Sequence, residues 1–436
     1  MNFLSPQSPE FHPPQTKEDP SVSFSEAVSG ASLVHDSVPK KYRKLFDTLR
    51  EDIRSFCKQF NIPLESLRSK EDFGKQLASK IIPSERMAEA VLLFERLEHL
   101  VTNREPLKET LPEYLEEAEH LYHLKEQYTA QCHLLKEAGI LNEHNAIAGI
   151  DGEEYPLPTL EEIAQRLFDH RELLEMKRDQ GFTKLLLVPF GMSLRSLRDV
   201  FRRFLFDYKK NHKMFGRKIP TRPNNSDRSD WEPLGSLLLV DEKMDTGNSP
   251  DIVYHPRSFL KGEQQGETKL QILTRQKRDP DITTPGWKIL LLQPSRPLDQ
   301  TSGIAPIPRE NQGKSQGRKN PRHDIETGKT AEHYLSLLLD AQGNQYSHRR
   351  GESGMTPEDW ILAFMTHLQE TGQSLDNPHD GINSSCNLIG SCFLTSSTGG
   401  TVLDAGWNPE GALVFLGATA RNDPRLNTGT RFVVEI

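Results

Sequence analysis

Residues 411–436 read GALVFLGATARNDPRLNTGTRFVVEI and decide the fold class. The first part of this stretch alternates in hydrophobicity, which predicts a strand with Ala412, Val414 and Leu416 facing a core. A polar loop follows, and residues 429–436 are predicted to form a last strand that is tied into a sheet. Because long amphipathic helices precede this β-rich end, the sequence predicts an α+β fold.

Four regions of the chain differ in composition. Residues 1–36 are rich in Pro, Ser and Gln and are expected to be a disordered tail. Residues 38–150 are expected to form a helical module, either a bundle or a hairpin. Residues 159–215 are expected to connect this module to the rest through a helix, a strand and a second helix. In residues 216–436, short strands and frequent turn residues predict a loop-rich α+β domain, in which the long polar segment 295–330 is expected to be either a functional loop or a long connection within the domain.

Two helix starts are explicit in the sequence. Thr159 and Glu162 have the spacing of a capping box, in which each side chain bonds the other residue's backbone N–H. Thr356 precedes Pro357 and Asp359, and this pattern is typical of a first helical turn. A helix is therefore predicted from Thr356, with Trp360 on its inner face and its end at Gly372.

The charge balance and hydropathy exclude several classes of protein. The 436 residues carry 54 Lys and Arg against 62 Asp and Glu, a formal net charge of −8, which argues against a dominant role in nucleic-acid binding. No apolar run approaches the roughly 18 residues of a membrane span. The N-terminus lacks the basic start and apolar core of a secretory signal. We therefore expect a cytoplasmic protein with no membrane span.

Two candidate ligand-binding motifs are incomplete. The sequence ETGKT at residues 326–330 resembles the end of a phosphate-binding loop, but His323 stands where that motif needs a glycine. Glu117 and His120 have metal-ligand spacing on a helix, with His123 nearby, but the matching copy that a two-metal bundle site needs is absent from the sequence. Exposed histidines on a charged helix are the favoured interpretation, and no cofactor or metal is expected.

Cys386 and Cys392 lie close together in the sequence. They are able to bind a metal, form a disulfide or act as redox thiols. Their spacing is not the CxxC of zinc ribbons, and no nearby Cys or His completes a tetrahedral set. Two small buried residues are the favoured interpretation.

The C-terminal pattern resembles the C-type-lectin-like domain of the formylglycine-generating-enzyme type. Such domains close with a Trp-bearing segment, a strand, a loop and a terminal G-x-R strand. Here Trp407, residues 411–416, residues 419–426 and Gly429-Thr430-Arg431 occupy these places, and the helix that carries Trp360 fits the domain's helical element. The resemblance implies structural roles for four residues: Trp360, Trp407, Gly429 and Arg431.

A narrower resemblance is to the variable proteins that retroelements diversify in bacteria of the candidate phyla. The segments that carry it are KLLLVPFGMSL (184–194), PGWKILLLQPS (285–295), IAPIPRENQGKSQGRKNPR (304–322) and SGMTPEDWILAFMTHL (353–368). This resemblance covers about residues 160–436. It implies that the terminal lectin-like segment binds a ligand and that its exposed residues are rewritten by adenine-directed mutagenesis.

A ligand face is predicted on the C-terminal segment, because polar loops and outward strand positions can change without disturbing a core. By alternation and loop placement, its members are Ser396, Ser397, Thr398, Thr401, Leu403, Asn408, Leu413, Phe415, Thr419, Arg421 and Asn422. Phe415 is the expected anchor, since exposed aromatic residues dominate interface energies.

The sequence thus favours non-catalytic binding of an unidentified protein or small molecule, with the helical module serving assembly or self-association. One alternative is an enzyme, either a thiol oxidase or a metal-dependent enzyme that uses Cys386 and Cys392. That pair lies in the right general region for the lectin-like oxidases, but its spacing and surroundings depart from theirs. A second alternative is a scaffold whose basic helix, residues 193–211, binds nucleic acid.

Overall fold

The computed structural model describes residues 32–63, 75–76, 80, 82, 84–106, 112–211, 238–239, 252–260, 262–376, 384–393, 401–408 and 413–436. The chain divides into two compact units, Met1–Thr110 and Leu111–Ile436. Helices and largely antiparallel sheets are both present, so the predicted α+β class is confirmed. The two units are described separately.

The first unit is helical. It contains α2 (Ser32–Ser37), the short 3₁₀ helix η1 (Lys40–Tyr42), α3 (Arg43–Gln59) and α5 (Ser84–Asn103). Helices α3 and α5 bury their apolar faces against each other, with Phe46 and Ile53 from α3 and Phe94 from α5 in the same cluster. The predicted disordered tail is wrong for residues 32–36, which belong to α2, and its remainder lies outside the described residues.

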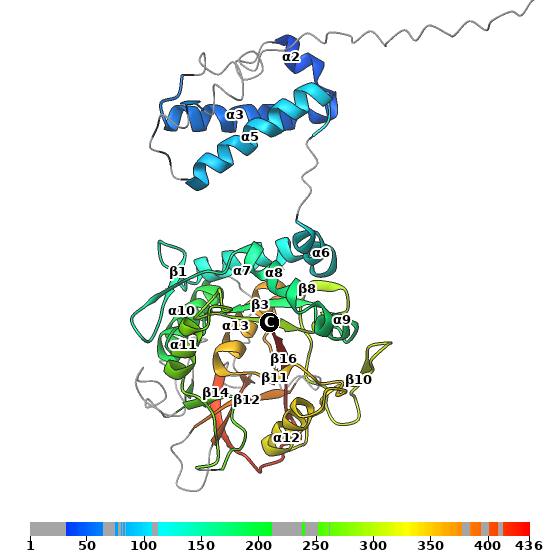
Figure 1. The fold of residues 1–436 in the computed structure, drawn as a ribbon. Helices are drawn as coiled ribbons and strands as arrows, with labels where there is room; N and C mark the ends of the chain where they lie inside the picture. Colours follow the sequence, from blue (N-terminus) through cyan, green and yellow to red (C-terminus); the bar gives the residue numbers. More distant parts are fainter. Residues whose placement is uncertain are drawn as a thin grey trace, which may run out of the picture. The chain divides into compact units, whose positions relative to one another are not determined.

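The second unit, Leu111–Ile436, carries two larger sheets and most of the helices (Figure 1). Its helices are α6 (Glu113–Tyr122), α7 (Leu124–Glu137), α8 (Leu160–Asp169), α9 (Arg171–Asp179), α10 (Leu194–Asn211), α11 (Lys269–Arg278), α12 (Ala331–Gln342) and α13 (Pro357–Thr371). Three small sheets have two strands each, namely β1 (Ala146–Ala148) with β2 (Glu154–Pro156), β7 (Pro294–Arg296) with β8 (Asp299–Ile304), and β9 (Ser315–Gln316) with β10 (Arg322–His323).

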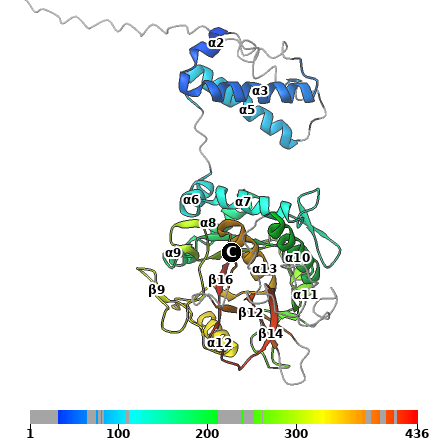
Figure 2. The ribbon, with the colours of Figure 1, turned by 180° about the vertical axis from the view of Figure 1, so that it is seen from behind.

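One larger sheet has four strands in the order β11-β16-β6-β3. Its strands are β3 (Lys184–Val188), β6 (Lys288–Leu292), β11 (Glu352–Gly354) and β16 (Phe432–Glu435). The last strand of the chain therefore lies inside a sheet, as predicted. Helix α13 lies close to β16 and the C-terminus in both ribbon views (Figure 1, Figure 2).

Helix α13 begins and ends as the sequence predicts. The Thr356 side chain accepts from the backbone N–H of Asp359, the Asp359 carboxylate accepts from the N–H of Thr356, and Gly372 closes the helix in the left-handed conformation. Every residue from Pro357 to Leu368 is buried, so the helix is surrounded on all sides. The predicted capping box, Thr159 with Glu162, starts α8.

The other larger sheet has the order β15-β12-β13-β14-β4, with β5 also paired to β12. Its strands are β4 (Leu238–Leu239), β5 (Ile252–Tyr254), β12 (Ser385–Phe393), β13 (Thr401–Asn408), β14 (Leu413–Ala420) and β15 (Thr428–Thr430). The predicted inward positions Val414 and Leu416 are buried. This sheet meets the four-stranded sheet at Gly390, where an added Cβ would collide with the carbonyl oxygen of Gly354.

Helix α7 closes the free edge of the four-stranded sheet. Strand β3 pairs only with β6 among the described strands, so its other edge has no neighbouring strand. Gln127 and Gln131, one turn apart on α7, form hydrogen bonds with the backbone along that edge. The Gln127 amide accepts from Leu185 N at 2.8 Å and donates to Thr183 O at 3.0 Å. Gln131 accepts from Leu187 N at 3.3 Å and donates to Leu185 O at 3.4 Å. Two side chains thus replace the hydrogen bonds of a missing strand.

The division between the units differs from the predicted domain boundaries. The predicted helical module ended at residue 150, whereas the chain divides after Thr110. Helices α6 and α7 belong to the second unit because Tyr122 of α6 and Leu134 and Leu135 of α7 pack in the same core as β3, β6 and α13. The predicted connecting region, residues 159–215, is also part of this core, since α8, β3 and α10 all contribute to it.

Candidate ligand-binding site

The predicted ligand face on β13 and β14 is only partly exposed. Leu403 and Thr419 are 0% and 3% exposed, so their assignment to the face is wrong. The reason is that both sides of β13 are covered. Leu403 packs in the main core, whereas the adjacent Val402 packs in a second cluster that includes residues of α12. Thr419 pairs with Val402 and is buried with it.

The other members of the predicted face have varied surroundings. The Phe415 ring lies over Gly406, where an added Cβ would come within 2.9 Å of it. Arg421 forms an ion pair with Glu332 at the start of α12. Asn422 is exposed, and three described members are half-buried, namely Thr401, Phe415 and Arg421. Five members have side chains outside the described part of the chain: Ser396, Ser397, Thr398, Asn408 and Leu413.

The four residues with predicted structural roles are all buried, and three of them meet at Asp376: Trp360, Trp407 and Arg431. The Arg431 guanidinium donates to both carboxylate oxygens of Asp376, at 2.8 and 3.0 Å. The indole of Trp360 donates to the same carboxylate at 2.8 Å, and the N–H of Trp407 donates to the Asp376 backbone carbonyl at 2.9 Å. The fourth residue, Gly429, lies against Ile307. Sequence reasoning missed Asp376, because an acidic residue in a polar stretch carries no sign of burial.

The structure does not bring Cys386 and Cys392 together as a thiol pair. Both lie on β12 and are free and buried, but Cys386 packs in the main core and Cys392 in the cluster with α12. Burial raises the pKa of each thiol to about 12. Neither thiol is ionised near neutral pH, and the thiolate is the reactive form.

The second unit contains a cleft of about 1160 Å³, which we call the β7–β10 cleft. Its lining comes mainly from residues 293–325, with further residues from α6, α9 and the junction of β15 and β16. A volume of this size accommodates a drug-sized ligand or a short peptide. The unusual length of the polar segment 295–330 was the sequence signal for this region, but the residues that face it from α9 were not identified.

His120 and His123 line one side of the cleft, at the end of α6. Both side chains are exposed, as the favoured interpretation of this motif predicted. Within the described ranges, no cluster of three or more His, Cys, Asp or Glu side chains is placed to hold a metal ion.

Leu298 projects from the tip of the β7–β8 hairpin at the cleft. Its side chain is 87% exposed, and its backbone has φ = 67° in a turn that follows Pro297. Turns of this kind favour Gly or Asn at the position of positive φ, because a Cβ is strained there. A strained, exposed leucine beside a cleft is therefore a candidate contact residue.

A carboxylate–amide cluster at the surface fixes the α9 side of the cleft. One oxygen of Asp179 accepts from three successive backbone N–H groups, those of Arg318 and Lys319 at 2.9 Å and Asn320 at 3.2 Å. Gly317, with φ = 93°, turns the chain so that these amides converge. Although partial burial pushes the pKa of Asp179 upward, the amide hydrogen bonds bring it below its ordinary value.

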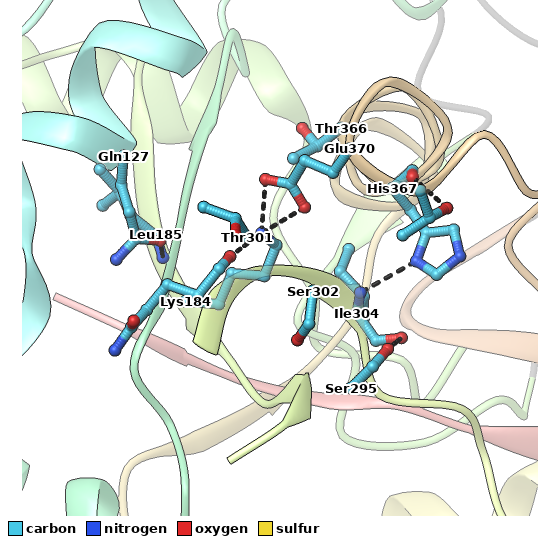
Figure 3. A network of polar contacts seen from close by, with 12 residues as sticks. Gln127, Lys184, Leu185, Ser295, Thr301, Ser302, Ile304, Thr366, His367 and Glu370 are labelled. Carbon is cyan, nitrogen blue, oxygen red and sulfur yellow. Dashed lines mark hydrogen bonds and ion pairs between the residues drawn. The ribbon is translucent and has the colours of Figure 1, made fainter. Parts of the chain in front are cut away.

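Behind the cleft wall, β8 is joined to α13 by polar contacts (Figure 3). Lys184 donates to both carboxylate oxygens of Glu370 at 2.7 Å and to the backbone carbonyl of Gln300, a cleft residue, at 2.6 Å. His367 accepts the backbone N–H of Ile304 through Nδ1 at 2.9 Å. These contacts hold one side of the cleft rigidly to the core.

Lowering the pH is expected to destabilise the second unit through His367. Burial and the nearby Arg431 charge lower the pKa of His367 to about 4, against an ordinary value of 6.5. Between these values the unfolded chain binds more protons than the folded one, so stability falls by about 1.4 kcal/mol per pH unit as the pH decreases. The total expected loss is up to about 3 kcal/mol.

Urea unfolding at about pH 7 and about pH 4 measures this contribution. His367→Gln keeps an acceptor for the Ile304 N–H and does not titrate, so its stability should fall less between the two pH values than that of the wild type. His333→Gln, at an exposed position on α12, is the control and should behave as wild type. An equal pH dependence in the wild type and His367→Gln would contradict the prediction.

No protein-family model, curated protein or solved structure matches this chain. Among the described residues, none of the helices is both long and apolar enough to cross a lipid bilayer.

Proposed function

We propose that the chain is a non-catalytic ligand-binding protein whose ligand occupies the β7–β10 cleft. The observation that carries this proposal is the cleft itself, a space of about 1160 Å³ built by a long segment on a rigid base. Rigid support under variable loops is the usual arrangement of a binding site.

Binding is favoured over catalysis because the buried cations next to the cleft, Arg431 and Lys184, already have internal partners. Arg431 is held by Asp376, and Lys184 is held by Glu370. Proton transfer or nucleophilic attack needs a group that is free to react with a substrate. The alternative of a thiol oxidase has less support, since Cys386 and Cys392 lie in different clusters with raised pKa values.

The second candidate site is the C-terminal face, within a C-type-lectin-like end that a retroelement diversifies. The observation that favours it is the alternation of β14, where Val414 and Leu416 enter the core and Phe415 lies half-buried on the other side. Without Leu403 and Thr419, the described part of this face consists of Thr401, Phe415, Arg421 and Asn422.

Leu298→Gly is expected to weaken binding at the β7–β10 cleft about tenfold or more while leaving the fold intact. Burying an exposed leucine against a ligand contributes about 1.5–3 kcal/mol, and 1.4 kcal/mol corresponds to a tenfold change in affinity. Glycine relieves the strain of the positive φ, which offsets its greater freedom in the unfolded chain. A peptide and glycan array, read with labelled protein and followed by titration of each hit, measures the effect.

Phe415→Ala is the matched variant for the second site, and thermal unfolding confirms that both variants are folded. Loss of binding in Leu298→Gly but not in Phe415→Ala supports the cleft. The reverse pattern supports the C-terminal face and overturns the cleft as the binding site. Hits that neither variant weakens would contradict both assignments.

A further inference from the structure

The charges that line the β7–β10 cleft are unbalanced, in contrast to the net negative charge of the whole chain. Its three acidic residues each have partners within the same unit, a cation for two of them and backbone amides for the third. Glu175 pairs with Lys319 at 2.9 Å, and Asp324 faces Arg322 at 3.8 Å. The third, Asp179, is held by the three backbone amides of residues 318–320.

Three cations of the lining remain: Arg178, Lys314 and Arg318. Among the described residues, none of them has an acidic partner within 4.0 Å. Lys314 and Arg318 are exposed and Arg178 is half-buried, and they come from separate segments, α9 and the two sides of β9. Cations gathered at one cleft without internal counter-ions raise its potential and favour an anionic ligand.

The same side of the cleft already holds a carboxylate. The Asp179 carboxylate accepts hydrogen bonds from the three successive backbone N–H groups that follow the turn at Gly317. Converging backbone amides of this kind bind anions in many proteins. Because Asp179 already occupies these amides, acidic groups of the ligand would pair with the neighbouring side chains of Arg178, Lys314 and Arg318.

The uncharged residues of the lining favour an acidic peptide over a nucleic acid. Pro297, Leu298 and Pro306 are exposed apolar residues at the cleft. Its only Phe, Tyr or Trp among the described residues is Phe432, which is 3% exposed and unavailable for stacking. Proteins that hold single-stranded nucleic acid stack its bases on exposed aromatic rings, and the described lining of this cleft has no exposed Phe, Tyr or Trp ring and only the smaller imidazoles of His120 and His123. A peptide with alternating acidic and apolar side chains fits both parts of the lining.

We infer that the ligand of the β7–β10 cleft is an acidic peptide segment, in which carboxylates meet Arg178, Lys314 and Arg318 and an apolar side chain meets Leu298. This inference rests on the proposed function, because it names the ligand class of the same cleft.

Fluorescence anisotropy with short labelled peptides tests the inference. The probes are a Glu-Leu-Gly repeat, its Ser-Leu-Gly and Lys-Leu-Gly counterparts, and an oligothymidylate. The acidic peptide is expected to bind at least about tenfold more tightly than the neutral one at about 50 mM salt, and this difference should largely disappear at about 500 mM salt, where screening is strong. The basic peptide is expected not to bind.

The triple variant Arg178→Gln, Lys314→Gln and Arg318→Gln should weaken binding of the acidic peptide about tenfold or more, toward the level of the neutral peptide. The control replaces three exposed cations elsewhere in the unit, Lys136, Arg203 and Arg278, by Gln and should leave the affinity unchanged. Thermal unfolding verifies that both triple variants are folded.

The outcomes separate the charge preference, the ligand class and the use of the cleft. Equal binding of acidic and neutral peptides, with sensitivity to Leu298→Gly, overturns the charge inference and leaves cleft binding in place. Preference for the oligothymidylate overturns the peptide in favour of nucleic acid. Absence of binding by the acidic peptide also overturns the inference, while the array screen with Leu298→Gly still decides the proposed function.

Discussion

Arg431→Met is expected to lower the free energy of unfolding of the second unit by about 3–5 kcal/mol, one of the two largest effects we predict for a local change. The Arg431 guanidinium donates two hydrogen bonds to Asp376 and two to the carbonyl oxygen of Ala305, the latter at 3.0 and 3.3 Å. Asp376 is 1% exposed. Without Arg431 its carboxylate is a buried charge, and among the described side chains only the Trp360 indole still donates a hydrogen bond to it. Removing one partner of a buried ion pair costs far more than the pair itself contributes.

The matched control is Arg275→Met, which breaks the two-pronged contact of Arg275 with Glu267 at 2.8 and 3.2 Å. The two side chains are 55% and 42% exposed, so the loss of this pair should cost less than about 1 kcal/mol. Urea unfolding followed by tryptophan fluorescence reports on this unit, because all four tryptophans lie in residues 111–436.

Adding Asp376→Asn to Arg431→Met separates the charge from the loss of packing. The asparagine keeps an oxygen for the Trp360 indole but carries no charge, so the double variant should be more stable than Arg431→Met alone. If Arg431→Met lowers the free energy of unfolding no more than Arg275→Met does, the prediction for the buried ion pair of Arg431 and Asp376 is wrong.

The parts of the fold that the sequence predicted correctly depend on local chemistry. The capping boxes at Thr159 and Thr356 need only two residues one turn apart, and the end of α13 needs only a glycine at positive φ. The final strand was likewise visible from its own apolar residues, and it lies in the four-stranded sheet.

The incorrect predictions concern features that depend on packing against distant segments of the chain. Alternation in β13 and β14 assumes one covered face, but this sheet is covered on both, so Leu403 and Thr419 are buried. The domain boundary failed for a similar reason. The apolar face of an amphipathic helix such as α7 predicts that the helix packs on a core, but the pattern does not identify which core. Helix α7 packs on the core of the second unit.

The sequence did not predict the cleft and placed the ligand face on the C-terminal segment instead. The length and polarity of residues 295–330 were compatible with a functional loop or with a long connection, and that segment supplies much of the cleft lining. Its charge balance was not readable from the sequence, because Asp179 and Glu175 reach partners about 140 residues away. Lys314 and Lys319 are both lysines of one short segment, and only the fold shows that Lys319 is paired with Glu175.

Gln127→Leu combined with Gln131→Leu is expected to destabilise the second unit by about 4 kcal/mol or more. Four backbone groups on the open side of β3 lose their partners: Thr183 O, Leu185 N, Leu185 O and Leu187 N. Each buried backbone group that is left without a hydrogen bond costs about 1–3 kcal/mol. Leucine is close to glutamine in volume, so the substitution removes the polar contacts while keeping most of the packing.

Gln165→Leu on the exposed side of α8 is the control, where loss of the hydrogen bond to Asp169 at 2.8 Å should cost less than about 1 kcal/mol. Amide hydrogen exchange distinguishes an opened edge from a packing defect, because Leu185 and Leu187 should lose protection while Leu290, inside the sheet on β6, exchanges only with global unfolding. An uncovered strand edge is also a template for pairing with another chain, so the double variant should associate as its concentration rises, which light scattering detects. The prediction is contradicted if Leu185 and Leu187 of the double variant stay protected from exchange and its stability equals that of Gln165→Leu. In that case α7 covers the sheet, but its glutamines contribute little as hydrogen-bond partners of β3.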